Sequence, residues 1–259
     1  MILSHRHQLI LLHCRKAAGS SIAVSLARLL GPADLQISAL VETVEHGIPL
    51  TARVRREAWR HSRALVDLAA GAGRHQRGRA IARAIDHAYR PRLGRKPPHA
   101  PASRVAAAFP REWATYRKLA VVRNPWDRTV SDYYWRTQRL RRPPSFARYV
   151  EALAAGRDLG GVVPLAFHDN WPLYTINDRV VADELVRFEA LSADLARACR
   201  RLELDWDGWL PRSKGGHRPR RPGAAGSSGV VYRDHYTPEL ARLVAGLYAP
   251  EIERFGYRF

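Results

Sequence analysis

The sequence predicts an α/β protein, in which helices flank a sheet and a basic helical segment is inserted. Two strand-to-helix units support this class. Residues 8–13, QLILLH, form a short apolar run of strand type, and IAVSLARLL follows at helical spacing. Residues 119–122 form a second apolar run, which leads directly into a helix. Such alternation of strands and helices is typical of α/β folds.

Length and composition predict one folded domain over residues 1–259. An apolar fraction of 46% argues against general disorder. The formal net charge is +19, from 43 Lys and Arg against 24 Asp and Glu. Such a charge predicts anionic partners, which include nucleotides, sulfated or phosphorylated glycans, nucleic acid and membrane surfaces, and it does not choose among them.

The two cysteines, Cys14 and Cys199, provide neither a disulfide framework nor a metal cluster. A reducing cytoplasm is therefore the expected location. The longest apolar run near the start, Leu9 to Leu12, is too short for a signal peptide or a membrane span. We expect a soluble protein without a membrane-spanning segment.

The loop CRKAAGSS joins the first strand to its helix and has the features of a phosphate-binding loop. Arg15 and Lys16 supply charge, and Gly19 permits close backbone approach. Ser20 or Ser21 can cap the helix, whose first amide groups attract anions. The loop differs from the GxxxxGK[ST] pattern because its lysine precedes the glycine. The alternative is an ordinary strand–helix turn with a solvated lysine.

Residues 40–98 form the predicted basic helical insertion. Helical stretches rich in Ala and Arg cover 52–68 and 77–89, and a Pro-rich basic loop ends the segment. This segment is either a basic wall for an acidic acceptor or a solvated insertion. His99 follows, just before a short predicted helix within 102–113. A lone histidine in a loop is ordinarily a surface residue.

The second strand-to-helix unit, residues 119–135, carries a well-marked helix start. Asn124 is the predicted N-cap and Pro125 the first helical residue. Asp127 lies in the first turn, and Ser131 follows four residues later on the same face. With Arg123 at the strand end, these groups can form an anion site. The alternative is that Arg123 pairs with a carboxylate and that Asp127 only caps the helix.

The remainder of the chain is predicted as helices around one hairpin and one long loop. The expected helices cover 146–156, 191–204 and a final stretch that begins after Thr237. Two strands are expected about an Asn177-Asp178 turn. Residues 212–229, rich in Gly, Pro, Ser and Arg, form a loop that is a candidate lid over an anion.

Two anion sites require a ligand with two anionic groups, and the residues resemble those of sulfotransferases that use 3′-phosphoadenosine-5′-phosphosulfate (PAPS). RKAAGSS, residues 15–21, resembles the PKTAGTS-like loop that binds the 5′-phosphosulfate in the carbohydrate, membrane-type branch and its bacterial relatives. Residues 122–133 resemble the VRNPxDRxxSxY stretch that binds the 3′-phosphate. The resemblance covers most of 5–30, 99–135 and 167–259, but not the basic insertion.

This resemblance implies a sheet of parallel strands flanked by helices, as in P-loop kinases, and a role for each matching residue. Lys16 would stabilise charge on the leaving group. Gly19, Ser20 and Ser21 would hold the 5′-phosphate, and Arg123 and Ser131 the 3′-phosphate. Arg15, Ala18 and Lys214 complete the implied cofactor-binding set. Arg15 replaces the usual proline, and Ala17 lacks a hydroxyl that is common at its position.

The implied reaction is in-line transfer of the sulfuryl group of PAPS to an acceptor hydroxyl, which leaves adenosine 3′,5′-bisphosphate. His99 is the candidate base, with Glu112 as a rival. The expected acceptor is a saccharide or glycolipid, anionic in view of the net charge; neither a nucleic-acid partner nor a metal is expected. Two alternatives remain: a kinase-like phosphotransferase and a non-enzymatic binder of nucleic acid or anionic polymers.

Overall fold

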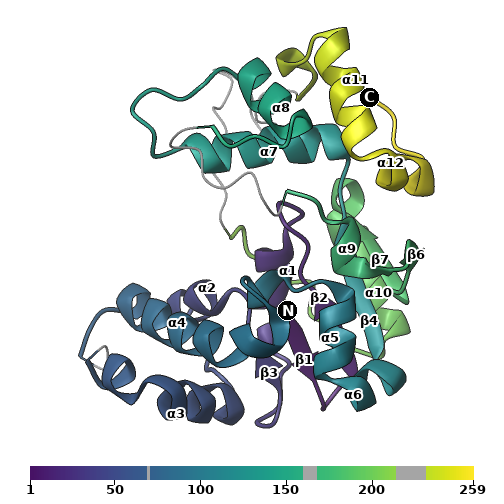
Figure 1. Ribbon diagram of the computed structural model, residues 1–259. Helices are drawn as coiled ribbons and strands as arrows, with labels where there is room; N and C mark the ends of the chain where they lie inside the picture. Colours follow the sequence, from purple (N-terminus) through teal and green to yellow (C-terminus); the bar gives the residue numbers. More distant parts are fainter. Residues whose placement is uncertain (69–70, 160–167, 214–231) are drawn as a thin grey trace. The chain divides into compact units, whose positions relative to one another are not determined.

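A five-stranded mixed sheet lies at the centre of the α/β fold (Figure 1). The computed structural model describes residues 1–68, 71–159, 168–213 and 232–259. The strand order is β3-β1-β2-β4-β7. The strands are β1 (Ile2–Ser4), β2 (Leu9–Leu12), β3 (Leu35–Gln36), β4 (Arg117–Val122) and β7 (Glu184–Arg187). The predicted α/β class with flanking helices is confirmed.

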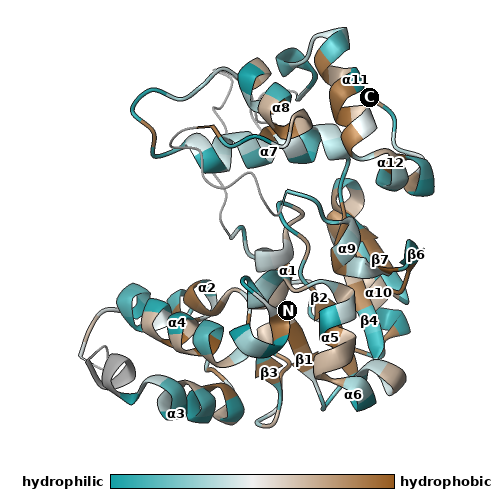
Figure 2. Ribbon diagram, in the orientation of Figure 1, coloured by the Kyte–Doolittle hydropathy of each residue, from teal (hydrophilic) through white to brown (hydrophobic). Residues whose placement is uncertain are grey.

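The parallel arrangement covers β2, β4 and β7, whereas β1 is antiparallel to both of its neighbours. Leu11 pairs with Leu119, and Leu119 pairs with Glu184. Every residue of β2 and the last four of β4 are buried, because a parallel strand covered on both faces needs a continuous apolar run. These strands are correspondingly hydrophobic in Figure 2. The sheet is therefore mixed rather than wholly parallel.

The described chain forms two compact units. Unit 1 contains Met1–Val122 and Pro172–Ser213, and unit 2 contains Arg123–Trp171 and the described part of Lys214–Phe259. Unit 1 holds the sheet. Its helices are α1 (Gly19–Ala27), α2 (Leu40–Glu45), α3 (Ala52–Leu68), α4 (Arg74–Leu93), α5 (Ala102–Ala108), α6 (Pro110–Thr115) and α10 (Leu191–Arg201), with short 3₁₀ turns at Pro97–His99 and Phe188–Ala190. The prediction of one sulfotransferase domain over 1–259 remains a prediction.

The basic insertion is helical, as predicted, and α3 spans the stretch that the sequence indicates. Its backbone departs from helical angles at Ser62, with φ −162° and ψ 55°. The helix α4 begins at Arg74, just after Gly73, and ends before Gly94, whose φ of 87° is left-handed. Glycine accepts this conformation without steric cost, so it terminates the helix.

The predicted hairpin turn is present, but its strands are short. Asn177 and Asp178 have φ of 49° and 57°, the pair of left-handed residues found in a two-residue hairpin. They join β5 (Thr175–Ile176) to β6 (Arg179–Val180), after a turn of helix, α9 (Trp171–Tyr174). The next apolar run forms β7 and pairs with β4 in the main sheet instead of extending the hairpin.

Unit 2 is helical. Its elements are α7 (Pro125–Thr137), α8 (Phe146–Ala154), a 3₁₀ turn at Tyr232–His235, α11 (Pro238–Leu247) and α12 (Ala249–Phe255). The predicted start of α7 is confirmed, since the Asn124 side chain accepts hydrogen bonds from the amides of Trp126 (3.0 Å) and Asp127 (3.4 Å). Thr237 caps α11 in the same way, through the amide of Leu240 at 3.3 Å.

Candidate functional site

The loop after β2 has a backbone suited to anion binding. Lys16 and Ala18 are both left-handed, with φ of 54° and 57°. A non-glycine residue in this region costs on the order of 1–3 kcal/mol, and such residues concentrate at functional sites. Ala18 directly precedes α1, and its carbonyl accepts from the amide of Ile22 at 3.1 Å. Left-handed residues before a helix direct successive amide N–H groups into one concavity, which favours an anion there.

Gly19, the first residue of α1, must be a glycine because the chain approaches it closely. A Cβ at this position would lie 2.9 Å from the carbonyl oxygen of Cys14 and would overlap the His13 ring at Cδ2 and Nε2. Real Cβ atoms do not tolerate such contacts, so a side chain would displace the ring or the backbone. The sequence indicated close backbone approach at Gly19, and the contact comes from the end of β2.

The serines of this loop are largely buried, at 9% exposed for Ser20 and 6% for Ser21. The Ser21 hydroxyl accepts a hydrogen bond from the amide of Ser213 at 3.1 Å. One turn further along α1, the Ser25 hydroxyl accepts from the Trp206 indole at 2.7 Å and donates to the carbonyl of Trp209. Residues 206–213 therefore lie along α1; we call them the α1 strap. The predicted cofactor residue Lys214, and nearly all of the predicted loop 212–229, lie outside the described residues.

His99 lies against the start of this loop. It is half-buried at the end of the Pro97–His99 turn, and its Nδ1 is 2.9 Å from the carbonyl oxygen of His13. The two imidazole rings meet edge to face, with centroids 4.8 Å apart and planes at 70°. The expectation for an isolated loop histidine was a surface position. His99 instead contacts His13, the residue that directly follows β2.

The contact with His13 determines the tautomer of neutral His99. A carbonyl oxygen can only accept a hydrogen bond, so the His99 Nδ1 must carry the proton and donate it. The lone pair of the neutral ring is then on Nε2. A backbone carbonyl bound to one ring nitrogen is a common device for orienting the other nitrogen for proton transfer. The rival base, Glu112, lies in the first turn of α6.

In unit 2, Arg123 lies two residues before α7, and Asp127 and Ser131 are four residues apart on one face of that helix. The Arg123 guanidinium donates to the Asp127 carboxylate from Nε at 2.7 Å and from Nη2 at 2.6 Å. Its side chain is 8% exposed, whereas Ser131 is half-buried. The alternative interpretation of the sequence, a carboxylate partner for Arg123, is thus realised within the candidate site. This pairing partly neutralises Arg123 and fixes its orientation.

A buried ion pair joins this helix to α12. Arg128 pairs with Glu251 at 2.6 Å, with both side chains at most 3% exposed, and its guanidinium stacks over the Tyr248 ring at 4.5 Å. The Tyr248 hydroxyl lies 3.0 Å from Nδ1 of His168. Burial raises the pKa of Tyr248 to about 12 and lowers the pKa of His168 below its ordinary value.

The predicted site residues divide between the two units. Lys16, Gly19, Ser20, Ser21 and His99 belong to unit 1, with Arg15 and Ala18 beside them in the loop. Arg123 and Ser131 belong to unit 2. The structure thus establishes a loop with an adjacent histidine in one unit, and an arginine–carboxylate pair with a serine in the other.

Sequence reasoning missed His13. It is 7% exposed, contacts both Gly19 and His99, and contributes the carbonyl that orients His99. A signal was available, because His13 ends an apolar strand at the carboxyl edge of parallel strands, where α/β proteins place their binding residues. Within the described ranges, no group of three or more His, Cys, Asp and Glu side chains is arranged to hold a metal ion.

Comparison of the chain with models of protein families, with curated proteins and with solved structures finds no match. Among the helices that the structure describes, none has both the length and the apolar character needed to cross a membrane. The remaining indications of function are the geometry of the loop in unit 1, the arginine–carboxylate pair in unit 2 and the motifs that contain them.

Proposed function

We propose that the protein is a PAPS-dependent sulfotransferase that transfers the sulfuryl group to a hydroxyl of a carbohydrate-type acceptor. The observation that carries this proposal is the hydrogen bond between His99 Nδ1 and the carbonyl of His13, two residues before the RKAAGSS loop. It associates a base of defined tautomer with a loop whose backbone suits an anion. Proton abstraction beside a bound phosphate group is the combination that sulfuryl transfer to an alcohol requires.

The residues of the first loop suit the 5′-phosphosulfate end of PAPS. The amides at the start of α1 and the lysine charge can hold a phosphate, and the Ser21 hydroxyl retains its own proton to donate, since Ser213 uses only its oxygen. Bound PAPS would supply an activated sulfuryl group with a phosphate leaving group. Lys16 would neutralise the charge that develops on that leaving group, which is electrostatic stabilisation of the transition state.

His99 would act on the acceptor. Its Nε2 lone pair would take the proton of the acceptor hydroxyl as the oxygen attacks, and the resulting imidazolium would keep its Nδ1 proton on the His13 carbonyl. Positioned general bases typically contribute about 10²–10⁴-fold to a rate.

Arg123 and Ser131 would hold the 3′-phosphate that distinguishes PAPS from ATP and AMP. Arg123 has five N–H donors and uses two of its nitrogens on Asp127, so its guanidinium is oriented by a residue in the first turn of α7. The partial neutralisation by Asp127 would make binding depend on the phosphate's geometry rather than on charge alone.

Thermal unfolding with nucleotide ligands tests this proposal. Adenosine 3′,5′-bisphosphate should stabilise the protein more than AMP, ATP or a short oligonucleotide at equal concentration. A ligand specific for the native state stabilises it by about 2.7 kcal/mol at a hundredfold its dissociation constant. Arg123→Ala should remove the preference for the bisphosphate over AMP. Equal stabilisation of the wild type by the bisphosphate and AMP would refute the proposed cofactor.

The base is tested by separating binding from turnover. His99→Ala should keep its stabilisation by the bisphosphate and lose about 10²–10⁴-fold in sulfuryl transfer from PAPS to a saccharide acceptor. His87→Ala is the matched control, because His87 is an exposed histidine on α4. Unchanged turnover in His99→Ala would exclude this histidine from the mechanism.

A further inference from the structure

The helix α3 presents a solvent-facing surface of arginines around a single tryptophan. Four exposed members occupy neighbouring positions on a helical projection, and exposed Arg63 follows the kink at Ser62. We call these residues the α3 outer face: Arg55, Arg56, Trp59, Arg60 and Arg63. Trp59 is 47% exposed, and the Arg63 guanidinium lies 5.0 Å from its ring centroid. From Arg55 to Arg60 the face extends about 7.5 Å along the helix, since each residue adds about 1.5 Å.

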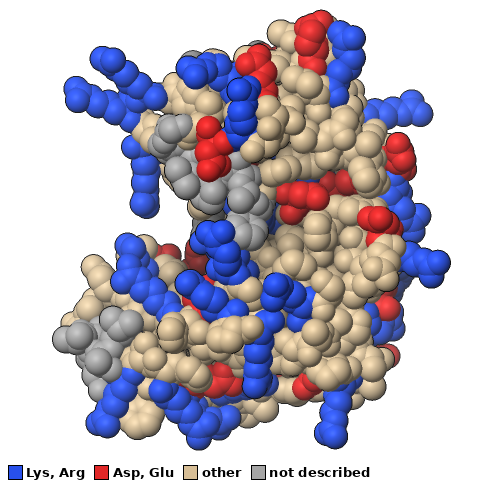
Figure 3. Space-filling view, viewed as in Figure 1, with Lys and Arg blue, Asp and Glu red and all other residues tan. Residues whose placement is uncertain are grey.

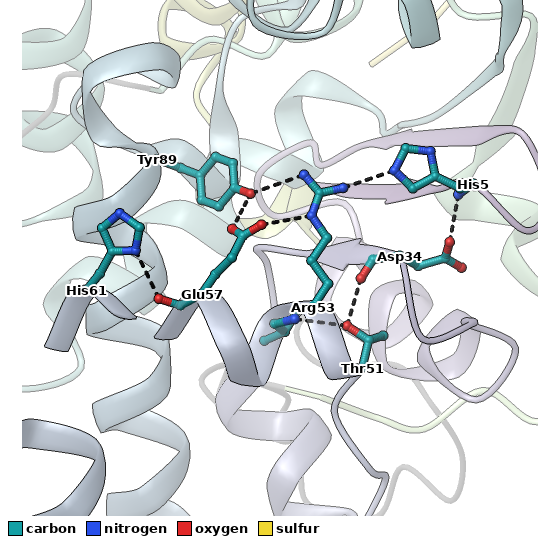
Figure 4. Close-up of polar contacts among 8 residues, drawn as sticks. His5, Asp34, Thr51, Arg53, Glu57, His61 and Tyr89 are labelled. Atoms are coloured by element: carbon teal, nitrogen blue, oxygen red, sulfur yellow. Dashed lines mark hydrogen bonds and ion pairs between the residues drawn. The ribbon is translucent and has the colours of Figure 1, made fainter. Parts of the chain in front are cut away.

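The opposite side of α3 is anchored by a different arginine, so the outer face has a fixed orientation within unit 1. Arg53 donates to the Glu57 carboxylate at 2.8 Å and to Nε2 of His5 at 2.9 Å (Figure 4). Glu57 also accepts from the Tyr89 hydroxyl of α4. Thr51 begins the helix, with its hydroxyl donating to the carbonyl of Asp34 at 2.7 Å and accepting from the amide of Val54.

This anchoring engages the Glu57 carboxylate with Arg53 and Tyr89, so Glu57 does not balance the arginines of the outer face. In the described parts of the chain, no carboxylate forms an ion pair with Arg55, Arg56 or Arg60. Residues 51–96 contain thirteen Lys and Arg but three Asp and Glu. Figure 3 shows Lys and Arg side chains over the region of α3 and α4.

Such an arrangement is unfavourable for an isolated helix. Arg56 and Arg60 are four residues apart within the regular part of α3, and a like-charge pair at this spacing costs roughly 0.2–0.5 kcal/mol. Repulsion between like charges on a helix that is otherwise well anchored is expected at a functional surface, where an anionic ligand would balance the positive charge.

We propose that the α3 outer face is a docking surface for a linear anionic saccharide chain, apart from the residues assigned to sulfuryl transfer. Arginine guanidinium groups bind sulfate and carboxylate groups through bidentate hydrogen bonds, and an exposed indole offers a flat apolar surface to a sugar ring. A single-stranded nucleic acid is usually held by several aromatic side chains in a groove. The outer face has one tryptophan on the outside of a helix, which favours the saccharide.

The choice of a saccharide as partner rests on the proposed function, since the chain would be the acceptor or its extension. The experiment measures binding of a fluorescent heparin octasaccharide to the full chain, with a neutral dextran oligomer and a single-stranded oligodeoxynucleotide of equal charge as comparison ligands. One variant carries Arg55→Gln, Arg56→Gln and Arg60→Gln. The matched control carries Arg139→Gln, Arg141→Gln and Arg142→Gln, three exposed arginines that follow α7 and change the net charge equally.

The α3 variant should bind the octasaccharide at least about tenfold more weakly, and its slope of log affinity against log salt should fall by about 2–3, near 0.7–0.9 for each lost contact. The control should change affinity less than about threefold, a difference that a purely global charge effect would not produce. Trp59→Ala should weaken binding of the octasaccharide without altering the slope of log affinity against log salt.

Equal losses in the two triple variants would overturn the proposal, because affinity would then follow net charge. Tighter binding of the oligodeoxynucleotide through the same arginines would also overturn it and identify a nucleic-acid surface. Stabilisation by adenosine 3′,5′-bisphosphate should be the same in both triple variants. If the wild type lacks that stabilisation while the octasaccharide still discriminates between the variants, the sulfotransferase proposal fails and the docking surface stands.

Discussion

Replacement of Gly19 by alanine should destabilise the protein although alanine favours helices. Helix propensity alone would raise the free energy of unfolding of Gly19→Ala by about 0.8–1.0 kcal/mol. The new methyl group would, however, overlap the His13 ring and lie 2.9 Å from a backbone oxygen, and overpacking of this kind costs about 1–3 kcal/mol. The net effect is a loss of up to about 2 kcal/mol of unfolding free energy.

Gly246→Ala is the matched control, because Gly246 is also helical and a Cβ there meets nothing within 4 Å. It should gain about 0.5–1 kcal/mol from propensity. Thermal unfolding followed by circular dichroism measures both variants, and 1 kcal/mol corresponds to about 2–4 °C in a chain of this size. Gly19→Ala should therefore unfold several degrees below Gly246→Ala.

A second measurement ties this strain to the candidate site. The added methyl group would disturb the loop at the start of α1, so bisphosphate binding should fall. It would also displace the His13 ring that contacts His99, so turnover should fall as well. Removing the ring in the double variant His13→Ala, Gly19→Ala should restore most of the stability. Equal thermal unfolding midpoints for the variants Gly19→Ala and Gly246→Ala would refute the close approach of His13 to α1.

Three further predictions concern unit 2. Asp127→Asn removes the charge beside Arg123 but keeps an oxygen acceptor, so it should bind adenosine 3′,5′-bisphosphate several-fold more tightly relative to AMP, as titration calorimetry can measure; weaker relative binding would instead show that the charge of Asp127 is needed to orient Arg123. Glu251→Gln leaves the Arg128 charge buried without its counterion, so it should lower the unfolding free energy by about 3–5 kcal/mol in urea denaturation, and a loss under 1 kcal/mol would contradict a fully buried pair. Burial lowers the pKa of His168 below 6.5, so His168 binds a proton in the unfolded chain at a higher pH than in the folded protein. The unfolding free energy should therefore be full above pH 6.5 and should fall as the pH drops toward the folded-state pKa of His168. The variant His168→Gln should show a smaller fall over this pH range.

Local signals predicted much of this protein, because they depend on neighbouring residues. The start of α7 followed from Asn124 and Pro125, whose roles are set by helix geometry. The extent of α3 followed from its propensity and its flanking breaks. A carboxylate partner for Arg123 was available as an alternative, but that alternative gave Asp127 only a capping role, and the structure shows Asp127 to be the partner.

The remainder depends on contacts between residues that are distant in the chain. β1 has three residues and no periodic pattern, so its antiparallel insertion beside β2 could not be read from the sequence. The Arg53 network joins His5, Arg53 and Tyr89, and no spacing rule connects such positions. His99 was predicted from a motif, but its tautomer requires the carbonyl of His13, which lies 86 residues earlier.

The α1 strap couples the candidate site to a segment that is remote from it in sequence. The Ser213 amide donates a hydrogen bond to Ser21, and the Trp206 indole donates one to Ser25. Opening of residues 206–213 therefore disturbs α1, whose first turn belongs to the RKAAGSS loop. Hydrogen exchange at the strap amides requires this local opening. A ligand that binds only when the strap is closed lowers the open population and so slows the exchange. Slower exchange in the strap would therefore report occupancy of the loop, even for a ligand that none of the strap residues touches.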